Sequence, residues 1–214
     1  MLPSFAVSLA ALLAALYLVW FCFRPSSLLK TCVKTASVLL LVVAAALVNA
    51  PVALIVALAL CAIGDFFLSL EGERSFLAGV AAFAAGHIAY IVLFISHPAS
   101  DSAGVPVWAI AVLFLFAAIM MALLYRHAGS LRFAVLAYVL VIAGMGVAAM
   151  SVPSSGALWL ALPAALMFMA SDTVLATEMF LLRSDHPLRK VTPFIVWALY
   201  WLAQLGFLLA FAPL

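Results

Sequence analysis

Long apolar runs alternate along this chain with short breaks that contain polar residues, proline or glycine. Helices that cross about 30 Å of hydrocarbon need roughly 20 apolar residues, and eight runs meet this requirement. We place the eight predicted spans at residues 3–23, 32–49, 51–70, 75–96, 105–125, 131–150, 157–182 and 191–212. Only Asn49-Ala50-Pro51 separates the second from the third, and we interpret this break as a tight turn that reverses the chain.

The first run begins almost at the N-terminus without the basic segment that a cleaved signal peptide carries. We therefore expect it to be retained as the first span. Because no polar domain, linker or low-complexity stretch interrupts the pattern, we expect one transmembrane domain over residues 1–214.

The basic residues test the number of spans independently. All nine lie at odd-numbered connections: Arg24, Lys30, Lys34, Arg74, Arg126, Arg132, Arg183, Arg189 and Lys190. The even-numbered connections, at 49–51, 97–105 and 151–156, have none. Since Lys and Arg concentrate in cytoplasmic loops, the sequence predicts an all-α bundle of eight transmembrane helices with both termini on the non-cytoplasmic side.

Composition excludes other classes of protein. Of 214 residues, 71% are hydrophobic, and a mean hydropathy of +1.40 lies far from that of an ordinary soluble domain. We expect an integral membrane protein of a bacterial cytoplasmic (inner) membrane. A formal charge of +2 from scattered basic residues argues against a nucleic-acid partner, and the three cysteines have no metal-site spacing. The oligomeric state is left open.

Two aspartates inside predicted spans are the main candidates for function. Asp65 and Asp172 each occur as a small residue, Asp, two residues and Leu, half the chain length apart, and both are predicted in the cytoplasmic half of the bilayer. A charged side chain in hydrocarbon costs at least about 2.5 kcal/mol, so it usually faces a cavity or a partner. The spacing suggests two duplicated four-helix halves, although His87 would then align with Phe194.

Other polar side chains lie within the same spans. His87 shares a predicted helical stripe with Phe76, Gly79, Phe83 and Tyr90, while Gly79 and Gly86 would allow another helix to approach closely. The hydroxyls of Tyr90, Tyr138 and Tyr200 need partners, and Gln204 lies on the same face as Tyr200. Each has a structural alternative: His87 could simply bond a neighbouring helix, Trp197, Tyr200 and Trp201 could simply pack, and Glu178 could be an interfacial carboxylate beside Arg183.

Two carboxylates with different neighbours can hold different protonation states, which suits acid/base hydrolysis. The same groups could instead relay protons in a small-solute or proton-coupled transporter. The chain has no G-x-S-x-G elbow and no H-E-x-x-H motif, which argues against a serine lipase and a zinc protease. With a single histidine inside the predicted spans we expect no metal site.

Four motifs together resemble those of a known family. They are Gly64-Asp65-x-x-Leu68, Phe76-x-x-Gly79-x-x-x-Phe83-x-x-x-His87-x-x-Tyr90, Ser171-Asp172-x-x-Leu175-Ala176 with Phe180, and Tyr200-x-x-Ala203-Gln204. In this order, from Lys34 to Gln204, the chain resembles the lysoplasmalogenase (YhhN-like) family of eight-span membrane proteins.

The resemblance implies an enzyme that hydrolyses the vinyl ether bond of a lysoplasmalogen to a fatty aldehyde and a glycerophospho-ethanolamine or -choline. It implies a lysophospholipid substrate within membrane lipid, and the chemistry requires no cofactor. Asp65 and Asp172 are then the expected catalytic pair, with the acid and the base unassigned. We expect His87, Tyr90, Tyr138, Tyr200 and Gln204 to orient the site or the substrate. Lys34, which matches a lysine usual in the family, either binds the substrate phosphate or only marks the interface.

Overall fold

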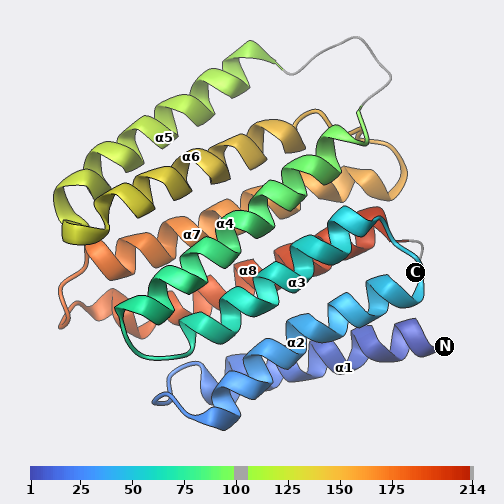
Figure 1. Cartoon of the computed structure of the whole chain (residues 1–214), viewed down its shortest axis with the longest axis horizontal. Helices are drawn as coiled ribbons and strands as arrows, with labels where there is room; N and C mark the ends of the chain where they lie inside the picture. Colours follow the sequence, from blue (N-terminus) through green and yellow to red (C-terminus); the bar gives the residue numbers. More distant parts are fainter. Residues whose placement is uncertain (99–105, 213–214) are drawn as a thin grey trace.

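Within residues 1–98 and 106–212, which the computed structural model describes, the chain forms eight α-helices and no strand (Figure 1). They are α1 (Leu2–Leu16), α2 (Leu28–Leu47), α3 (Val52–Leu68), α4 (Glu73–Ile95), α5 (Val107–His127), α6 (Arg132–Ala149), α7 (Ala161–Phe180) and α8 (Thr192–Phe211). A π-helical turn, Tyr17–Phe21, continues α1, and a 3-10 turn, Gly156–Leu160, precedes α7. The predicted spans are confirmed within a few residues, while the predicted start of the fifth span at residue 105 lies outside the described residues.

The predicted turn between the second and third spans is confirmed. Helix α2 ends at Leu47 and α3 begins at Val52. Between them Asn49 adopts a positive φ of 52°, a conformation that asparagine tolerates better than most residues. The amide of Ala50 donates to the Ala45 carbonyl at 3.0 Å and closes the end of α2.

Seven of the helices in the described ranges are long and apolar enough to cross a membrane. The exception, α3, has 17 residues, which is still at the short end of the range for a spanning helix. These lengths and this composition define a polytopic helical membrane bundle.

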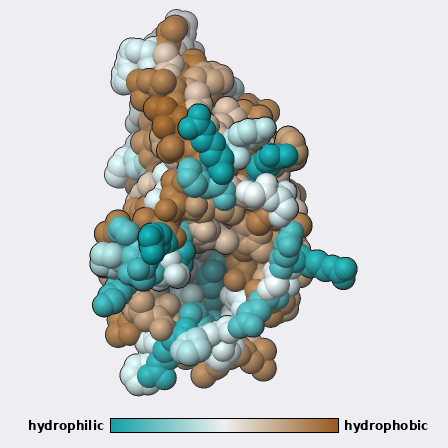
Figure 2. Space-filling view, turned by 90° about the vertical axis from the view of Figure 1, so that its left-hand side faces the viewer, coloured by the Kyte–Doolittle hydropathy of each residue, from teal (hydrophilic) through white to brown (hydrophobic). Residues whose placement is uncertain are grey.

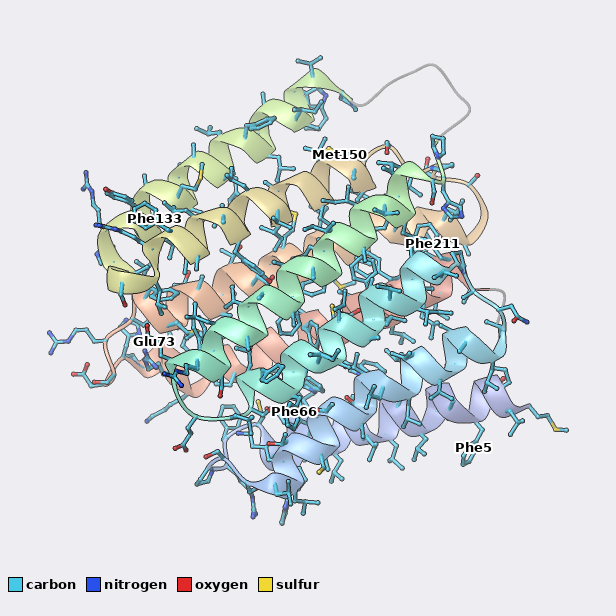
Figure 3. All side chains as sticks on the ribbon, viewed as in Figure 1. Phe5, Phe66, Glu73, Phe133, Met150 and Phe211 are labelled. Carbon is cyan, nitrogen blue, oxygen red and sulfur yellow. The ribbon has the colours of Figure 1, made fainter. Side chains whose placement is uncertain are left out.

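Consecutive helices run in opposite directions, so the connections alternate between the two ends of the bundle (Figure 1). Figure 3 shows nitrogen- and oxygen-tipped side chains gathered at the end that carries Glu73, and far fewer at the end that carries Phe211. We call the first the basic end: it contains the α1–α2, α3–α4, α5–α6 and α7–α8 connections, where the Lys and Arg residues lie.

Glycines allow α3 and α4 to pack closely, as the sequence predicts. A Cβ atom added to Gly79 would lie 2.7 Å from Leu68, and one added to Gly86 would lie 3.0 Å from the sulfur of Cys61. Side chains larger than hydrogen would therefore push the two helices apart. This approach brings the Asp65 turn of α3 next to the helix that carries His87.

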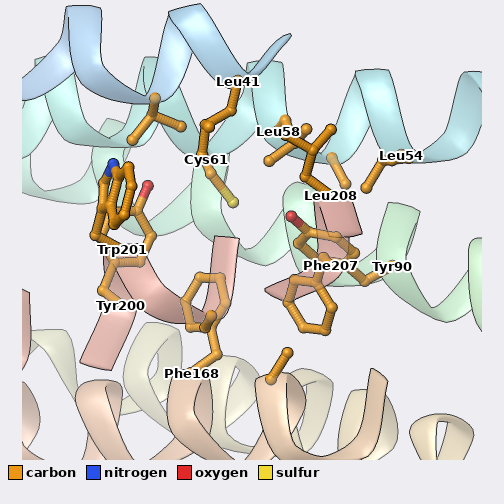
Figure 4. Packing of buried hydrophobic residues seen from close by; sticks show 14 of the residues in the cluster. Leu41, Leu54, Leu58, Cys61, Tyr90, Phe168, Tyr200, Trp201, Phe207 and Leu208 are labelled. Carbon is orange, nitrogen blue, oxygen red and sulfur yellow. The ribbon is translucent and has the colours of Figure 1, made fainter. Parts of the chain in front are cut away.

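Aromatic side chains fill the centre of the bundle between α4, α7 and α8. The rings of Tyr90 and Phe207 lie side by side, with centroids 4.2 Å apart, and Phe168 packs edge-on against Tyr200 (Figure 4). Trp197 joins α8 to α1, because its indole N–H donates to the Ala14 carbonyl at 3.0 Å. Trp197, Tyr200 and Trp201 are all buried in this part of the bundle.

Candidate active site

A cavity of about 220 Å³ opens within the half of the bundle that faces the basic end. Figure 2 views the molecule from this end and shows a hollow with hydrophilic side chains at its floor. Apolar residues from α3, α4, α6, α7 and α8 form most of the wall. Asp65 and Asp172 both line this cavity, so the two predicted carboxylates face one shared space.

Asp65 lies one turn before the end of α3 and is held by two partners. The Lys34 ammonium lies 3.0 Å from Oδ1, and the Tyr200 hydroxyl donates to Oδ2 at 2.7 Å. The Asp65 side chain is 1% exposed and that of Lys34 is 17% exposed. A buried carboxylate beside an ammonium is stabilised in its ionised form, so this is a charge-neutral ion pair.

Asp172 lies about two turns before the end of α7. In the described residues its side-chain partners are a phenol and an imidazole. The Tyr138 hydroxyl donates to its Oδ2 at 2.5 Å, and Nε2 of His87 lies 3.2 Å from the same oxygen. Nε2 also lies 2.9 Å from the Tyr138 oxygen. At 14% exposure, the Asp172 side chain is more open to the cavity than that of Asp65.

The hydrogen-bond network assigns the tautomer of His87. The Tyr138 proton points to Asp172, so the proton on Nε2 serves the Tyr138 and Asp172 oxygens. Within the described residues, the buried Nδ1 has no hydrogen-bond partner. Nε2 is therefore the ring nitrogen that joins His87 to the polar site.

Three of the predicted site residues do not line this cavity. His87 is fully buried and is connected to the lining residues only through its hydrogen bonds. Tyr90 donates its hydroxyl to the side-chain oxygen of Gln204, and both side chains are fully buried in the aromatic centre of the bundle. Neither lines the cavity or bonds a carboxylate in the described part of the chain. The predicted need of Tyr90, Tyr138 and Tyr200 for partners is confirmed, but only Tyr138 and Tyr200 have the aspartates as partners.

Tyr17 and Trp197 line the cavity beside Lys34, although the sequence did not single out Tyr17. The Tyr17 and Trp197 rings are 4.4 Å apart, and the Lys34 ammonium lies 5.8 Å from the Trp197 ring. Tyr17 starts the π-helical turn that ends α1, and single π-helical turns often occur at functional sites. No sequence signal marks this turn in advance.

Glu178 lies near the end of α7 and does not pair with Arg183. Arg183 pairs with the exposed Asp185 at 3.4 Å, and the cation nearest to the Glu178 carboxylate is Arg189, at 3.9 Å. The chain folds back after α7 through a short 3-10 turn, Pro187–Lys190, which brings Arg189 to this position. Glu178 also lines the cavity.

In the described ranges, no group of three His, Cys, Asp or Glu side chains is arranged to hold a metal ion. The polar groups that face the cavity include carboxylates, an ammonium and phenols, which can transfer protons and form ion pairs. One carboxylate is paired with an ammonium and a phenol, and the other accepts from a phenol and contacts an imidazole. Such a pair can deliver a proton and accept another within the same space.

The helices and the buried carboxylates define a polytopic membrane protein with an intramembrane polar site. A family model described as the YhhN family matches residues 29–211, which include every side chain that contacts the two aspartates. The chain belongs to the YhhN family. Comparison with curated proteins and with solved structures found no significant match.

Proposed function

We propose that this protein hydrolyses the vinyl ether bond of lysoplasmalogens and releases a fatty aldehyde and a glycerophospho-ethanolamine or -choline. The observation that carries the proposal is the pair of differently partnered carboxylates in one largely apolar cavity. The YhhN family is associated with lysoplasmalogenase activity, which agrees with this chemistry.

Vinyl ether hydrolysis begins when an acid protonates the β-carbon. The electron pair of the C=C double bond forms the new C–H bond, and an oxocarbenium ion remains. Water then adds to the cationic carbon and loses a proton to a base. The resulting hemiacetal collapses to the aldehyde and the alcohol. The protein must therefore supply a proton, stabilise a cation and activate water, much as paired carboxylates do in glycosidases.

We assign the general acid to Asp172 and the base to Asp65. Lys34 favours the ionised state of Asp65, which suits a group that stabilises the cation and accepts a proton from water. Asp172 has no Lys or Arg partner among the described residues, and its side chain is more open to the cavity, which suits a group that delivers a proton to the substrate. Tyr138 and His87 orient its carboxyl group, and the N–H groups of Lys34 that Asp65 does not use can bind the substrate phosphate.

The transporter alternative has less support. Transporters commonly bind solutes where helices are interrupted near mid-membrane. The candidates for such breaks were Pro163 and the Gly144 and Gly146 pair. Helix α6 continues through both glycines, and Pro163 lies in the first turn of α7, where proline is tolerated.

The test is incubation of the purified protein in detergent with a 1-alkenyl lysophospholipid and, separately, with its 1-acyl counterpart. We expect aldehyde from the alkenyl lipid and no fatty acid from the acyl lipid. Fatty acid release would instead indicate an esterase. No product from either lipid would overturn the proposal.

The proposal includes an inner-membrane location with the basic end in the cytoplasm, which follows from the distribution of Lys and Arg. Single cysteines introduced at Ser130 or at Ser154, in a variant without the natural cysteines, test this orientation. We expect a membrane-impermeant thiol reagent to label position 154, and not position 130, from the outer side. The reverse pattern would overturn the orientation and leave the reaction unaffected.

A further inference from the structure

Glu178 is a carboxylate of the cavity that the proposed reaction does not use. It lies on α7, six residues after Asp172 and nearer to the basic end. Its side chain is 18% exposed, and it lines the same cavity as both aspartates. It therefore lies between the reacting groups and the cavity mouth.

Arg189, the cation nearest to the Glu178 carboxylate, forms its hydrogen bonds with backbone carbonyls instead. Arg189 donates through Nη2 to the backbone carbonyls of Glu178 and Leu182, at 2.6 Å and 3.1 Å, and through Nε to that of Arg183, at 3.0 Å. This guanidinium satisfies carbonyls at the end of α7, which are left open at every helix C-terminus. Nη1 is 3.9 Å from the Glu178 carboxylate, beyond hydrogen-bond distance. Nothing else in the described part of the chain hydrogen-bonds to that carboxylate.

The charges that line the cavity are unequal. The acidic side chains are Asp65, Asp172 and Glu178, and Lys34 is the only Lys or Arg among the described lining residues. Lys34 is matched by Asp65, and Arg189, 3.9 Å from the Glu178 carboxylate, is not a lining residue, so within the lining Glu178 adds negative charge at the mouth. An excess of one charge sign in a cleft with apolar walls attracts ligand groups of the opposite sign.

The position of Glu178 matches the length of a lysophospholipid headgroup. Six residues of α-helix place Glu178 about 9 Å from Asp172 along the helix axis. The glycerol, the phosphodiester and the two-carbon linker span this distance in a bent conformation, between the vinyl ether and the headgroup nitrogen. Lys34 and Tyr17 line the same cavity and supply an ammonium and a hydroxyl for the phosphate.

We propose that Glu178 binds the ammonium group of the substrate headgroup and so selects ethanolamine- and choline-type lysolipids over those without a cation. This inference rests on the proposed function for the identity of the ligand. It gives Glu178 a role in specificity and none in the chemical step.

Binding of ether lysolipids tests the inference separately from hydrolysis. The probes are 1-O-alkyl lysolipids, which lack the vinyl ether, with phosphoethanolamine, phosphocholine or phosphoglycerol headgroups. All three carry the same phosphodiester, and the last has no ammonium. Affinity is measured by calorimetry on the full chain in detergent, at matched micelle concentration.

We expect the wild-type protein to bind the two ammonium lipids about tenfold more tightly than the phosphoglycerol lipid, a difference of about 1.4 kcal/mol. Glu178→Gln should lose this preference, and Glu178→Asp should retain part of it. Asp185→Asn is the matched control, because this carboxylate lies at the same end of the protein but is 73% exposed and pairs with Arg183. It should retain the full preference.

Equal wild-type affinity for the three lipids, or an undiminished preference in Glu178→Gln, would overturn the inference. If Glu178→Gln does not fold, Glu178→Asp decides, because an unchanged preference there contradicts close contact. Headgroup preference without aldehyde release from alkenyl lipids would overturn the proposed reaction alone. Aldehyde release without headgroup preference would overturn the headgroup site alone.

Discussion

Asp65 and Asp172 occupy matching places in two four-helix halves, α1–α4 and α5–α8. Each lies on the third helix of its half. Each is contacted by the second helix of the same half, through Lys34 or Tyr138, and by the fourth helix of the other half, through Tyr200 or His87. The two halves thus exchange contacts in the same way around both carboxylates.

The chemistry of the two settings differs although their topology is the same. Asp65 has an ammonium and a phenol as partners, whereas Asp172 has a phenol and an imidazole. The Lys34 ammonium favours the ionised form of Asp65, whereas no Lys or Arg of the described residues pairs with Asp172. Equivalent backbone positions can therefore supply one ionised and one exchangeable carboxyl group, because the partner side chains decide the proton.

The largest expected effect comes from removing either carboxylate. Asp65→Asn and Asp172→Asn should each lower aldehyde release by about 10²–10⁴-fold, the usual contribution of a positioned acid or base. The double variant should be little worse than either single one, because groups that act as a unit are not additive. Extraction yield and thermal unfolding are the controls. Near wild-type turnover in either single variant would exclude a paired mechanism.

Breaking the ion pair between Lys34 and Asp65 should destabilise the protein more than removing the Asp172 carboxylate does. Lys34→Met leaves the Asp65 carboxylate buried without a cation, which should cost about 3–5 kcal/mol. Thermal unfolding in detergent measures the loss, and Lys34→Met combined with Asp65→Asn should recover much of it without recovering activity. Asp172→Asn should destabilise far less. Equal stability of Lys34→Met and the wild type would show that the ammonium does not stabilise Asp65.

Removing one phenol from each aspartate gives a smaller and more selective comparison. Tyr138→Phe should reduce kcat up to about tenfold, because a hydrogen bond between uncharged groups is worth about 0.5–1.5 kcal/mol and Asp172 would keep only His87 as a partner. Tyr200→Phe should reduce kcat less, because Lys34 still holds Asp65. Steady-state aldehyde release tests both. A larger loss of kcat in Tyr200→Phe than in Tyr138→Phe would contradict this expectation and show that turnover depends more on the phenol bound to Asp65.

The smallest effect on turnover is expected from the polar pair outside the cavity. Tyr90→Phe leaves the buried Gln204 oxygen without its donor, which should cost about 1–3 kcal/mol of stability. Aldehyde release per folded molecule should change less than in Tyr138→Phe. A loss of turnover equal to that of Tyr138→Phe would place Tyr90 in the reaction.

The sequence alone determined the helices, their number and the end of the bundle at which the basic residues lie. These features follow from local properties, since the length of an apolar run and the position of a break are written in consecutive residues. It also identified both aspartates, because a carboxylate in an apolar segment is conspicuous without any structure.

Only the tertiary structure decided which groups meet. Lys34 contacts Asp65, Tyr138 and His87 contact Asp172, and Tyr90 is paired with Gln204 outside the cavity. Each contact joins two different helices, consecutive or far apart in the chain, and depends on how those helices rotate and pack, for which an apolar run carries no local signal. The π-helical turn at Tyr17 and the return of Arg189 to the end of α7 are likewise results of packing. The different electrostatic settings of the two aspartates, on which the proposed reaction depends, arise from these contacts.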